Sequence, residues 1–322
     1  MFDLVREVFG IRVEERPGGV AWHDDVRTLA LIDDATGEEL GICLWDPWAR
    51  DGKMAGTIAF MDLLEADAAG PDGVVPPAVT MLVTMVPRPE DGAPATVAVY
   101  EAGVLFHEFG HVLDFTIGSR RAVALDDSWW GTDWVEGPSF FLEYWARLPE
   151  VFARYARHPE TGEPAPVALV EALAIEQAIQ DVPYLSKYIQ LGGIDLAVHG
   201  PDDVDLDEAW RTAHAVIPLP DTTGAFRPFP MSMVTGGYDA AIYGVSYALS
   251  IRDDLLATVE GRGVLSAENG RRYIDQVLRP GPFVPPTQRL AAFLEHPVSP
   301  EPLVARMGRA IDAARRASDA RS

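Results

Sequence analysis

Two histidines and a glutamate stand together in the run His107-Glu108-Phe109-Gly110-His111, which is an HExxH motif. The apolar periodicity around the motif predicts a helix over residues 96–117. A four-residue spacing places both imidazoles on one face of such a helix, where they can bind one tetrahedral Zn²⁺ ion. Glu108 is then placed to take a proton from a water molecule that the metal activates. The motif therefore predicts one zinc ion held by His107 and His111, with Glu108 as the general base.

The same residues could instead lie on a solvated helix face without a metal. Val104, Leu105 and Phe106 directly precede the motif, so the helix is expected to be buried where the polar groups begin. Buried polar groups need partners, and a metal ion supplies one. A catalytic zinc usually takes three protein ligands and keeps a fourth position for water. A third ligand must therefore come from elsewhere in the chain.

The elements that must position this site divide into an early strand-rich part and a later helical part. Strands are predicted over residues 27–33 and 39–46, joined as a hairpin, and over residues 78–86, which is a candidate edge strand. Long loops are predicted over residues 118–133 and 216–237. The expected fold is mainly α with a small β-sheet (α+β), in one domain over residues 1–322. Residues 1–95 are its β-rich part, 96–312 its helical part and 313–322 a frayed tail. The helices after the first are predicted over 138–148, 164–180, 205–215 and 239–260.

Composition narrows the classes of partner. The chain has 322 residues and a net charge of −23, which opposes a phosphate backbone and argues against nucleic acid. No apolar run approaches the roughly 20 residues needed to cross a membrane, and the first ten residues lack the apolar core of a signal peptide. The single cysteine, Cys43, is expected in a buried strand rather than as a nucleophile. We therefore expect a cytoplasmic protein.

The stretch from Tyr100 to Trp145 resembles the thimet oligopeptidase family of zinc metallopeptidases, in which an HEFGH helix is followed by a Glu-x-Pro-Ser segment. Here that segment is Glu136-Gly137-Pro138-Ser139. The resemblance extends over nearly the whole chain, through the runs at residues 22–27, 50–53, 236–240 and 270–282. It implies a zincin-type catalytic domain with His107, His111 and Glu136 as zinc ligands. It also implies that Glu108 shuttles the proton in peptide-bond hydrolysis.

Glu143 lies seven residues after Glu136, close to two helical turns, so it could share that face and orient a metal ligand. An ordinary surface glutamate is the equal alternative. Three tyrosines follow later in the chain: Tyr238 in the Gly-Gly-Tyr turn, and Tyr243 and Tyr247, four residues apart on one helical face. One of them could donate a hydrogen bond to the developing oxyanion. For Tyr243 and Tyr247, packing in the core is the favoured alternative.

Two departures from the family pattern bear on the substrate. The family's histidine upstream of Gly-Gly-Tyr falls on Met233, and two of its tyrosines fall on Ile242 and Val245, so these three line a more apolar substrate site. The long helical N-terminal half of the family has no counterpart in the sequence. We therefore expect an open cleft, or one that a partner or a second copy closes.

Three functions remain open from the sequence. The first is zinc-dependent hydrolysis of short peptides. The second is a peptidase-derived zinc enzyme that acts on one metabolite or modified peptide, favoured by the replaced substrate-binding positions. The third is a non-catalytic peptide-binding protein stabilised by zinc, which the presence of Glu108 beside the metal ligands disfavours.

Overall fold

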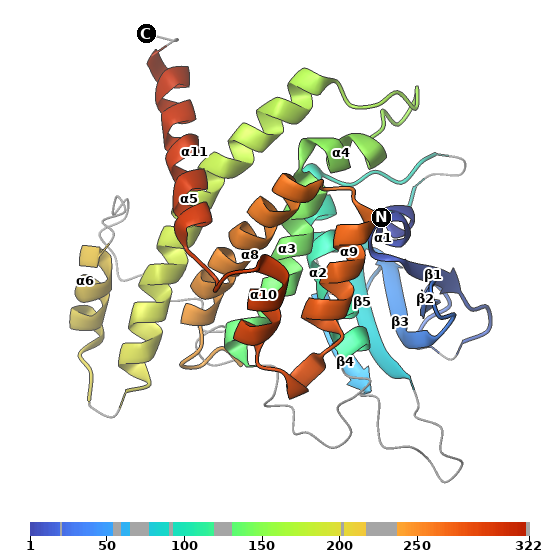
Figure 1. Cartoon of the computed structure of the whole chain (residues 1–322), viewed down its shortest axis with the longest axis horizontal. Coiled ribbons are helices and arrows are strands. Elements are labelled where there is room, and N and C mark those ends of the chain that lie inside the picture. The colour runs from blue at the N-terminus through green and yellow to red at the C-terminus, as the bar shows by residue number, and fades with distance from the viewer. Residues whose placement is uncertain are drawn as a thin grey trace.

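The computed structural model describes residues 1–19, 21–53, 59–64, 77–89, 93–118, 131–200, 203–216 and 237–319. Helices form one side of the molecule and a mixed sheet forms the other (Figure 1). This mostly helical architecture with a small sheet confirms the fold class expected from the sequence. None of the helices in these ranges is long and apolar enough to cross a membrane.

The sheet has five strands in the order β1-β2-β3-β5-β4. They are β1 (Ile11–Glu15), β2 (Arg27–Asp33), β3 (Glu39–Trp48), β4 (Ala59–Leu64) and β5 (Ala78–Val86). β5 runs parallel to β3, and the other neighbouring pairs are antiparallel. One consequence corrects a prediction: residues 78–86 form an inner strand, and the edges of the described sheet are β1 and β4. A strand's place in a sheet depends on pairing with distant segments, which its own residues do not specify.

The alternation of buried and partly exposed residues in β5 explains why this strand was found from sequence, since one of its faces packs against a helix. Cys43 is fully buried in β3, as predicted. Burial raises the pKa of its thiol to about 12, so it stays protonated and unreactive.

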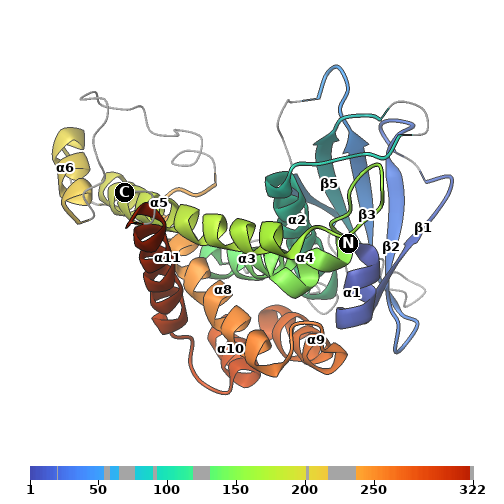
Figure 2. The ribbon, with the colours of Figure 1, turned by 90° about the horizontal axis from the view of Figure 1, so that it is seen from above.

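The helical part begins with α2 (Val99–Gly118), which packs against β3, β4 and β5, and α3 (Thr132–Arg147), which packs against α2. Figure 2 shows α2 lying between the sheet and the helices α3, α8 and α11. The long helix α5 (Val167–Val198) extends away from the sheet and carries α6 (Leu206–Val216) beside its far end. The other elements are α1 (Phe2–Phe9), α4 (Pro149–Tyr155), α8 (Tyr243–Arg262), α9 (Ala267–Tyr273), η3 (Ile274–Leu278), η4 (Gly281–Phe283), α10 (Pro286–Leu294) and α11 (Glu301–Asp319).

Prolines account for two wrong helix boundaries. One helix was predicted to start at Pro138, but this proline lies inside α3. Another helix was predicted to end at residue 180, but α5 continues through Pro183. Packing of α5 against α4, α6, α8 and α11 offsets the local cost of its proline. Residues 313–319, expected to fray, continue the helix α11. The predicted loops at 118–133 and 216–237 lie almost wholly outside the described residues.

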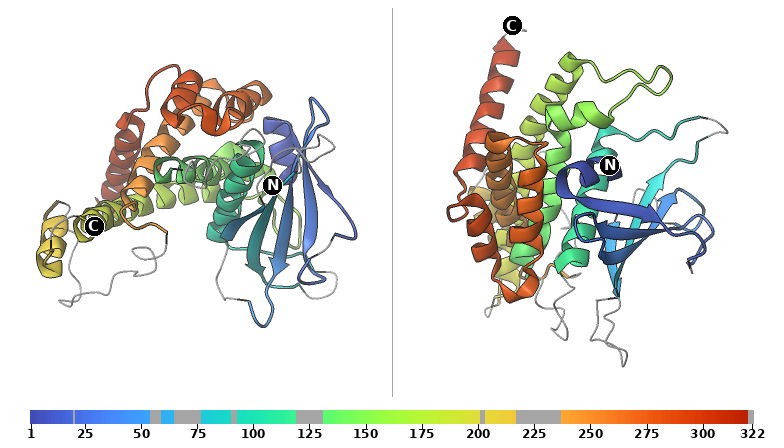
Figure 3. Two further views of the ribbon diagram at one scale, coloured as in Figure 1. Left: turned by 90° about the horizontal axis from the view of Figure 1, so that it is seen from below. Right: turned by 45° about the vertical axis from the view of Figure 1, so that its right-hand side comes forward.

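A single large hydrophobic core runs through both parts of the molecule. It joins strand residues such as Leu29 and Leu82 to helix residues such as Phe109, Leu249 and Phe293. The C-terminal helices α9 and α10 pack close to the start of the chain at α1, as the views in Figure 3 also show. The metal-binding candidates thus lie on helices that are fixed on several sides.

Candidate metal centre

The two helices that carry the motif residues approach each other very closely at Gly110. A side chain at this position would meet Ser139 Cα at 2.7 Å and the Pro138 carbonyl oxygen at 3.0 Å. Only glycine therefore allows α2 and α3 to pack at this distance. Gly110 directly precedes His111, and Pro138 and Ser139 closely follow Glu136. The contact therefore brings the side chains of His111 and Glu136 together.

His107, His111 and Glu136 converge on one point. Glu136 Oε2 lies 3.2 Å from His107 Nε2 and 3.5 Å from His111 Nε2. One nitrogen or oxygen from each residue lies within 4.8 Å of the others. In the described part of the chain this is the one group of three such side chains close enough to share an ion. Two imidazole nitrogens and a carboxylate oxygen make a donor set that suits Zn²⁺.

The charges of the buried carboxylates favour a positive charge between His107, His111 and Glu136. Burial acts to raise the pKa of Glu136, but hydrogen bonds from His107 and His111 hold it well below its usual range. Burial acts to lower the pKa of His107, but hydrogen bonds to Glu136 and Glu143 outweigh this and raise it to about 10. The carboxylates thus attract a cation between the imidazoles, whether a proton or a metal ion.

Glu143 is buried rather than on the surface, which removes the alternative of an ordinary surface glutamate. Its Oε2 lies 2.9 Å from His107 Nδ1, the nitrogen that faces away from Glu136. Its other oxygen, Oε1, pairs with Arg147 NH2 at 2.8 Å, one turn further along α3. A carboxylate at this position fixes the tautomer and the ring orientation of the histidine.

Glu108 lines the cleft beside the ligands and is not part of the cluster. Burial raises the pKa of Glu108, although the nearby His111 and His107 act to lower it. The pKa is therefore shifted toward neutrality, which suits a general base. A backbone N–H of Phe60, on the edge strand β4, donates to its carboxylate. The ring of Phe60 also stacks on His111, with centroids 5.5 Å apart. β4 therefore contacts both the general-base candidate and a candidate ligand.

The cleft at this centre, here called the metal cleft, has a volume of about 380 Å³. Tyr238 lines this cleft, and its hydroxyl donates a hydrogen bond of 2.5 Å to Glu136 Oε1. The turn that carries Tyr238 is held by Asp195 of α5, which accepts hydrogen bonds at 3.1 Å from the backbone N–H groups of Ala240 and Ile242. Three separate helices, α2, α3 and α5, thus position the groups around the candidate ligands.

Comparison with known proteins decides the family. Residues 1–309 match the sequence pattern of the family described as Peptidase family M3. The chain belongs to this family. It is 31% identical to oligopeptidase A of Escherichia coli over 290 residues, which is 87% of this chain and 42% of the relative. It is 28% identical to dipeptidyl carboxypeptidase of Escherichia coli (87% and 41%) and 24% to a thimet-like oligopeptidase of Dictyostelium discoideum (91% and 44%). The chain thus spans less than half the length of these relatives, and the resemblance found from sequence is confirmed.

The positions where this M3 chain departs from the family pattern fall in different places. Val245 lines the metal cleft, whereas Ile242 does not line it and is fully buried in the core. Tyr243 and Tyr247 are 40% and 37% exposed and do not line the cleft, so the favoured core packing was wrong for both. Met233 lies outside the described residues.

Several residues of the site were missed from the sequence. Arg147 carries the simplest signal, because it lies four residues after Glu143 on one helix. Tyr184 and Tyr188, also four apart, line the cleft from α5, but the predicted helix ended at residue 180. Phe60 had no usable signal, since β4 was not predicted.

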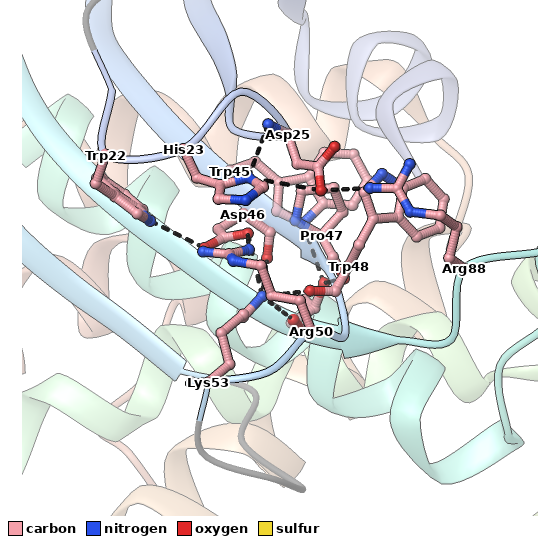
Figure 4. Close-up of polar contacts among 11 residues, drawn as sticks. Trp22, His23, Asp25, Trp45, Asp46, Pro47, Trp48, Arg50, Lys53 and Arg88 are labelled. Atoms are coloured by element: carbon pink, nitrogen blue, oxygen red, sulfur yellow. Dashed lines mark hydrogen bonds and ion pairs between the residues drawn. The ribbon is translucent and has the colours of Figure 1, made fainter.

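The family-like runs at residues 22–27 and 50–53 meet in a separate cluster at the end of β3, at the buried Asp46. Figure 4 shows Asp46 enclosed by Trp22, Arg50 and Lys53. Arg50 donates to both its carboxylate oxygens at 2.5 and 2.6 Å, and Lys53 Nζ lies 3.1 Å from it. Lys53 also donates to the backbone carbonyls of Asp46, Trp48 and Thr84. Gly52 has φ +86°, so the turn that returns Lys53 to the sheet requires glycine. This cluster anchors the segment that leaves β3 on the way to β4.

Proposed function

We propose that the chain is a zinc-dependent peptidase whose single zinc ion is held by His107, His111 and Glu136. The observation that carries the proposal is the convergence of two imidazole nitrogens and one carboxylate oxygen in a buried cleft, with a separate glutamate beside them. A structural zinc would usually have four protein ligands, whereas three leave a position for the reaction. When bound, the ion would acidify a water molecule and polarise the scissile carbonyl.

In this proposal Glu108 moves the proton. It accepts a proton from the attacking water and then delivers it to the leaving amine nitrogen, which must be protonated for the peptide bond to break. Its burial and raised pKa suit both steps, because a carboxylate with a pKa nearer neutrality both binds and releases a proton readily at neutral pH. The N–H of Phe60 holds one side of the carboxylate in place.

The substrate class follows from the edge strand. Among the residues that the structure describes, β4 pairs only with β5, and it lies beside His111 and Glu108. An extended peptide can add to such an edge through backbone hydrogen bonds, which places a peptide bond close to the metal. Met61 and Leu63 on β4 are about half exposed and offer apolar contacts for side chains of that peptide.

We assign the hydroxyl of Tyr188, which accepts a hydrogen bond from Tyr184, as the donor that replaces the family's missing tyrosines near the oxyanion. Both line the metal cleft, and burial raises the pKa of each, so both keep their protons. Tyr238 is already bonded to Glu136 and is instead a positioning residue for that ligand. Tyr188→Phe is expected to lower kcat about 10- to 100-fold with little change in KM, because a donor that acts only in the transition state is lost.

The proposal is tested by incubating a mixed library of short peptides with zinc-loaded protein and identifying the products by mass spectrometry. Glu108→Gln is the control, since it keeps the shape of the side chain and removes the base. We expect cleavage by the unmutated protein, a loss of at least about 100-fold in the variant, and equal zinc content in both.

A second function has one observation in its favour: Val245 stands in the cleft wall where the family has a tyrosine. An apolar wall there suits one particular metabolite or modified peptide better than peptides in general. If the zinc-loaded protein cleaves no peptide of the library, this second function replaces the first.

A further inference from the structure

A second hollow opens next to the metal cleft. It has a volume of about 490 Å³ and lies among α3, α4, α5, α8 and α11, at the end of α3 that is remote from Glu136. We call it the apolar cleft. Figure 2 shows α5, α8 and α11 side by side, and these helices form its walls together with the start of α4. Its size is within the range of ligand sites, about 300–1,000 Å³.

The two clefts adjoin and share one wall. Tyr100, Tyr144, Arg147, Gln177 and Gln180 line both of them. Tyr100 is 71% exposed, so this shared wall is reached from solvent. In our inference, a chain bound in the metal cleft passes over this shared wall, on the exposed side at Tyr100, to reach the apolar cleft.

The walls of the apolar cleft select for apolar groups. Leu148, Phe152, Leu173 and Leu256 line it, from α5, α8 and the region of α4. Three arginines and three carboxylates also line it, so their formal charges cancel. The inner arginines are already paired: Arg147 with Glu143 at 2.8 Å, and Arg306 with Asp253 at 2.5 Å and with Asp181. The surface that remains for a ligand is mostly apolar, and an exposed apolar hollow of this kind marks a binding site.

The length of α3 gives the distance from the metal. Glu136 and Arg147 are eleven residues apart on this helix, which corresponds to about 16 Å at about 1.5 Å per residue. An extended peptide covers that distance in about four to five residues.

We propose that the apolar cleft is a specificity subsite that takes a bulky apolar side chain about four residues from the scissile bond. The inference rests on the proposed peptidase function and adds the substrate class: peptides of at least about five residues with a large aliphatic or aromatic residue at this distance. Shorter peptides reach only the metal cleft.

The test compares peptides that differ only in whether and where they carry one phenylalanine. A phenylalanine is moved along an otherwise Ala/Gly/Ser peptide, and the cleavage position relative to it is read by mass spectrometry. We expect cleavage about four residues from the phenylalanine, and kcat/KM at least about tenfold above that of the peptide with alanine at the same place. Cleavage that ignores the position of the phenylalanine would overturn the subsite.

Two variants fill the apolar cleft from opposite walls: Ala174→Trp on α5 and Ala305→Trp on α11. Each is expected to reduce the preference for the phenylalanine peptide about tenfold. Ala172→Trp is the matched control, because Ala172 is exposed on the same helix and does not line the cleft. If the control reduces the preference as much as the two variants do, the subsite lies elsewhere.

Binding measurements separate the subsite from the chemistry. In Glu108→Gln protein, calorimetry of the two uncleaved peptides is expected to show at least about tenfold tighter binding of the phenylalanine peptide, and Ala174→Trp is expected to remove this difference. If this result were obtained without cleavage of any peptide, the proposed peptidase function would fail, and the apolar cleft would remain a binding site for an apolar residue of a peptide. Equal binding of both peptides would overturn the subsite even if cleavage were observed.

Discussion

Two buried carboxylates, Glu136 and Asp46, sit in opposite electrostatic surroundings. Asp46 is enclosed by Arg50 and Lys53, so its negative charge is balanced by side chains of permanent positive charge. Burial acts to raise its pKa, but hydrogen bonds from Arg50, Trp22 and Lys53 hold the pKa far below its usual range. Glu136 is surrounded by two imidazoles, a tyrosine hydroxyl and a serine hydroxyl, none of which carries a permanent charge.

This difference distinguishes a carboxylate that stabilises the local structure from one that can bind a ligand. A buried carboxylate that has its own cations fixes the backbone around it and leaves nothing for a ligand to supply. A buried carboxylate whose donors carry no permanent charge depends on a cation that can come and go, either a proton on the imidazoles or a metal ion that takes its place. The same chemical group, a buried carboxylate, therefore stabilises the structure at the end of β3 and, in our proposal, binds zinc between α2 and α3.

The largest expected effect is on zinc binding. Glu136→Ala removes a proposed ligand and is expected to weaken zinc affinity by more than about 100-fold, since loss of a group that only supports a ligand typically costs about 10–100-fold. Competition with a chelating dye measures this affinity. Asp46→Asn is the matched control and should keep one zinc ion per chain. Equal loss of zinc in both variants would mean that the two clusters do not differ as argued.

The next effect is on stability. Asp46→Ala leaves Arg50 and Lys53 without their buried anion, and breaking a buried pair in this way costs about 3–5 kcal/mol. Urea unfolding measures the change in the free energy of unfolding. Asp51→Ala, at an exposed residue of the neighbouring turn, is the control and should change it by less than about 0.5 kcal/mol. A loss below about 1 kcal/mol for Asp46→Ala would contradict the role of the cluster as an anchor.

The sequence predicted the parts of the site that local spacing determines. His107, Glu108 and His111 lie within one helical turn, so periodicity alone placed them together. Glu136 required a known pattern, because its contact with α2 depends on the close approach of two helices at Gly110. β5 was found from its composition, but its inner position was not, since β4 pairs with it from another part of the chain. Tyr184 and Tyr188 were lost because tertiary packing carries α5 past Pro183.

A third buried carboxylate, Asp33, is also paired with arginines, and the pH dependence of stability tests whether such pairing stabilises its charged form. Burial acts to raise its pKa, but hydrogen bonds from Arg271 and Arg279 and from the N–H of Ala35 lower it from 3.8 to about 2. The folded state therefore holds the charged form more strongly, and this stabilises the protein above pH 3.8 by about 2 kcal/mol. The stabilisation is lost as pH falls from 3.8 to about 2.

In Asp33→Asn, the slope of unfolding free energy against pH in this acid range is therefore expected to be shallower than in the unmutated protein. Urea unfolding at several pH values measures it. Asp51→Asn, at an exposed position, should leave the slope unchanged. Identical slopes in Asp33→Asn and the unmutated protein would show that the arginine pair does not compensate this carboxylate.

The smallest expected effect concerns Glu143, which combines features of both kinds of carboxylate. It has a permanent cation in Arg147 and also contacts the proposed ligand His107. Glu143→Gln keeps an oxygen for His107 Nδ1–H but removes the charge that makes this imidazole a stronger ligand, so zinc affinity is expected to fall about tenfold. Glu150→Gln, exposed on α4, is the matched control for the same change of charge. If zinc affinity is the same in both variants, Arg147 alone balances Glu143, and Glu143 belongs with Asp46 as an anchor rather than with the metal centre.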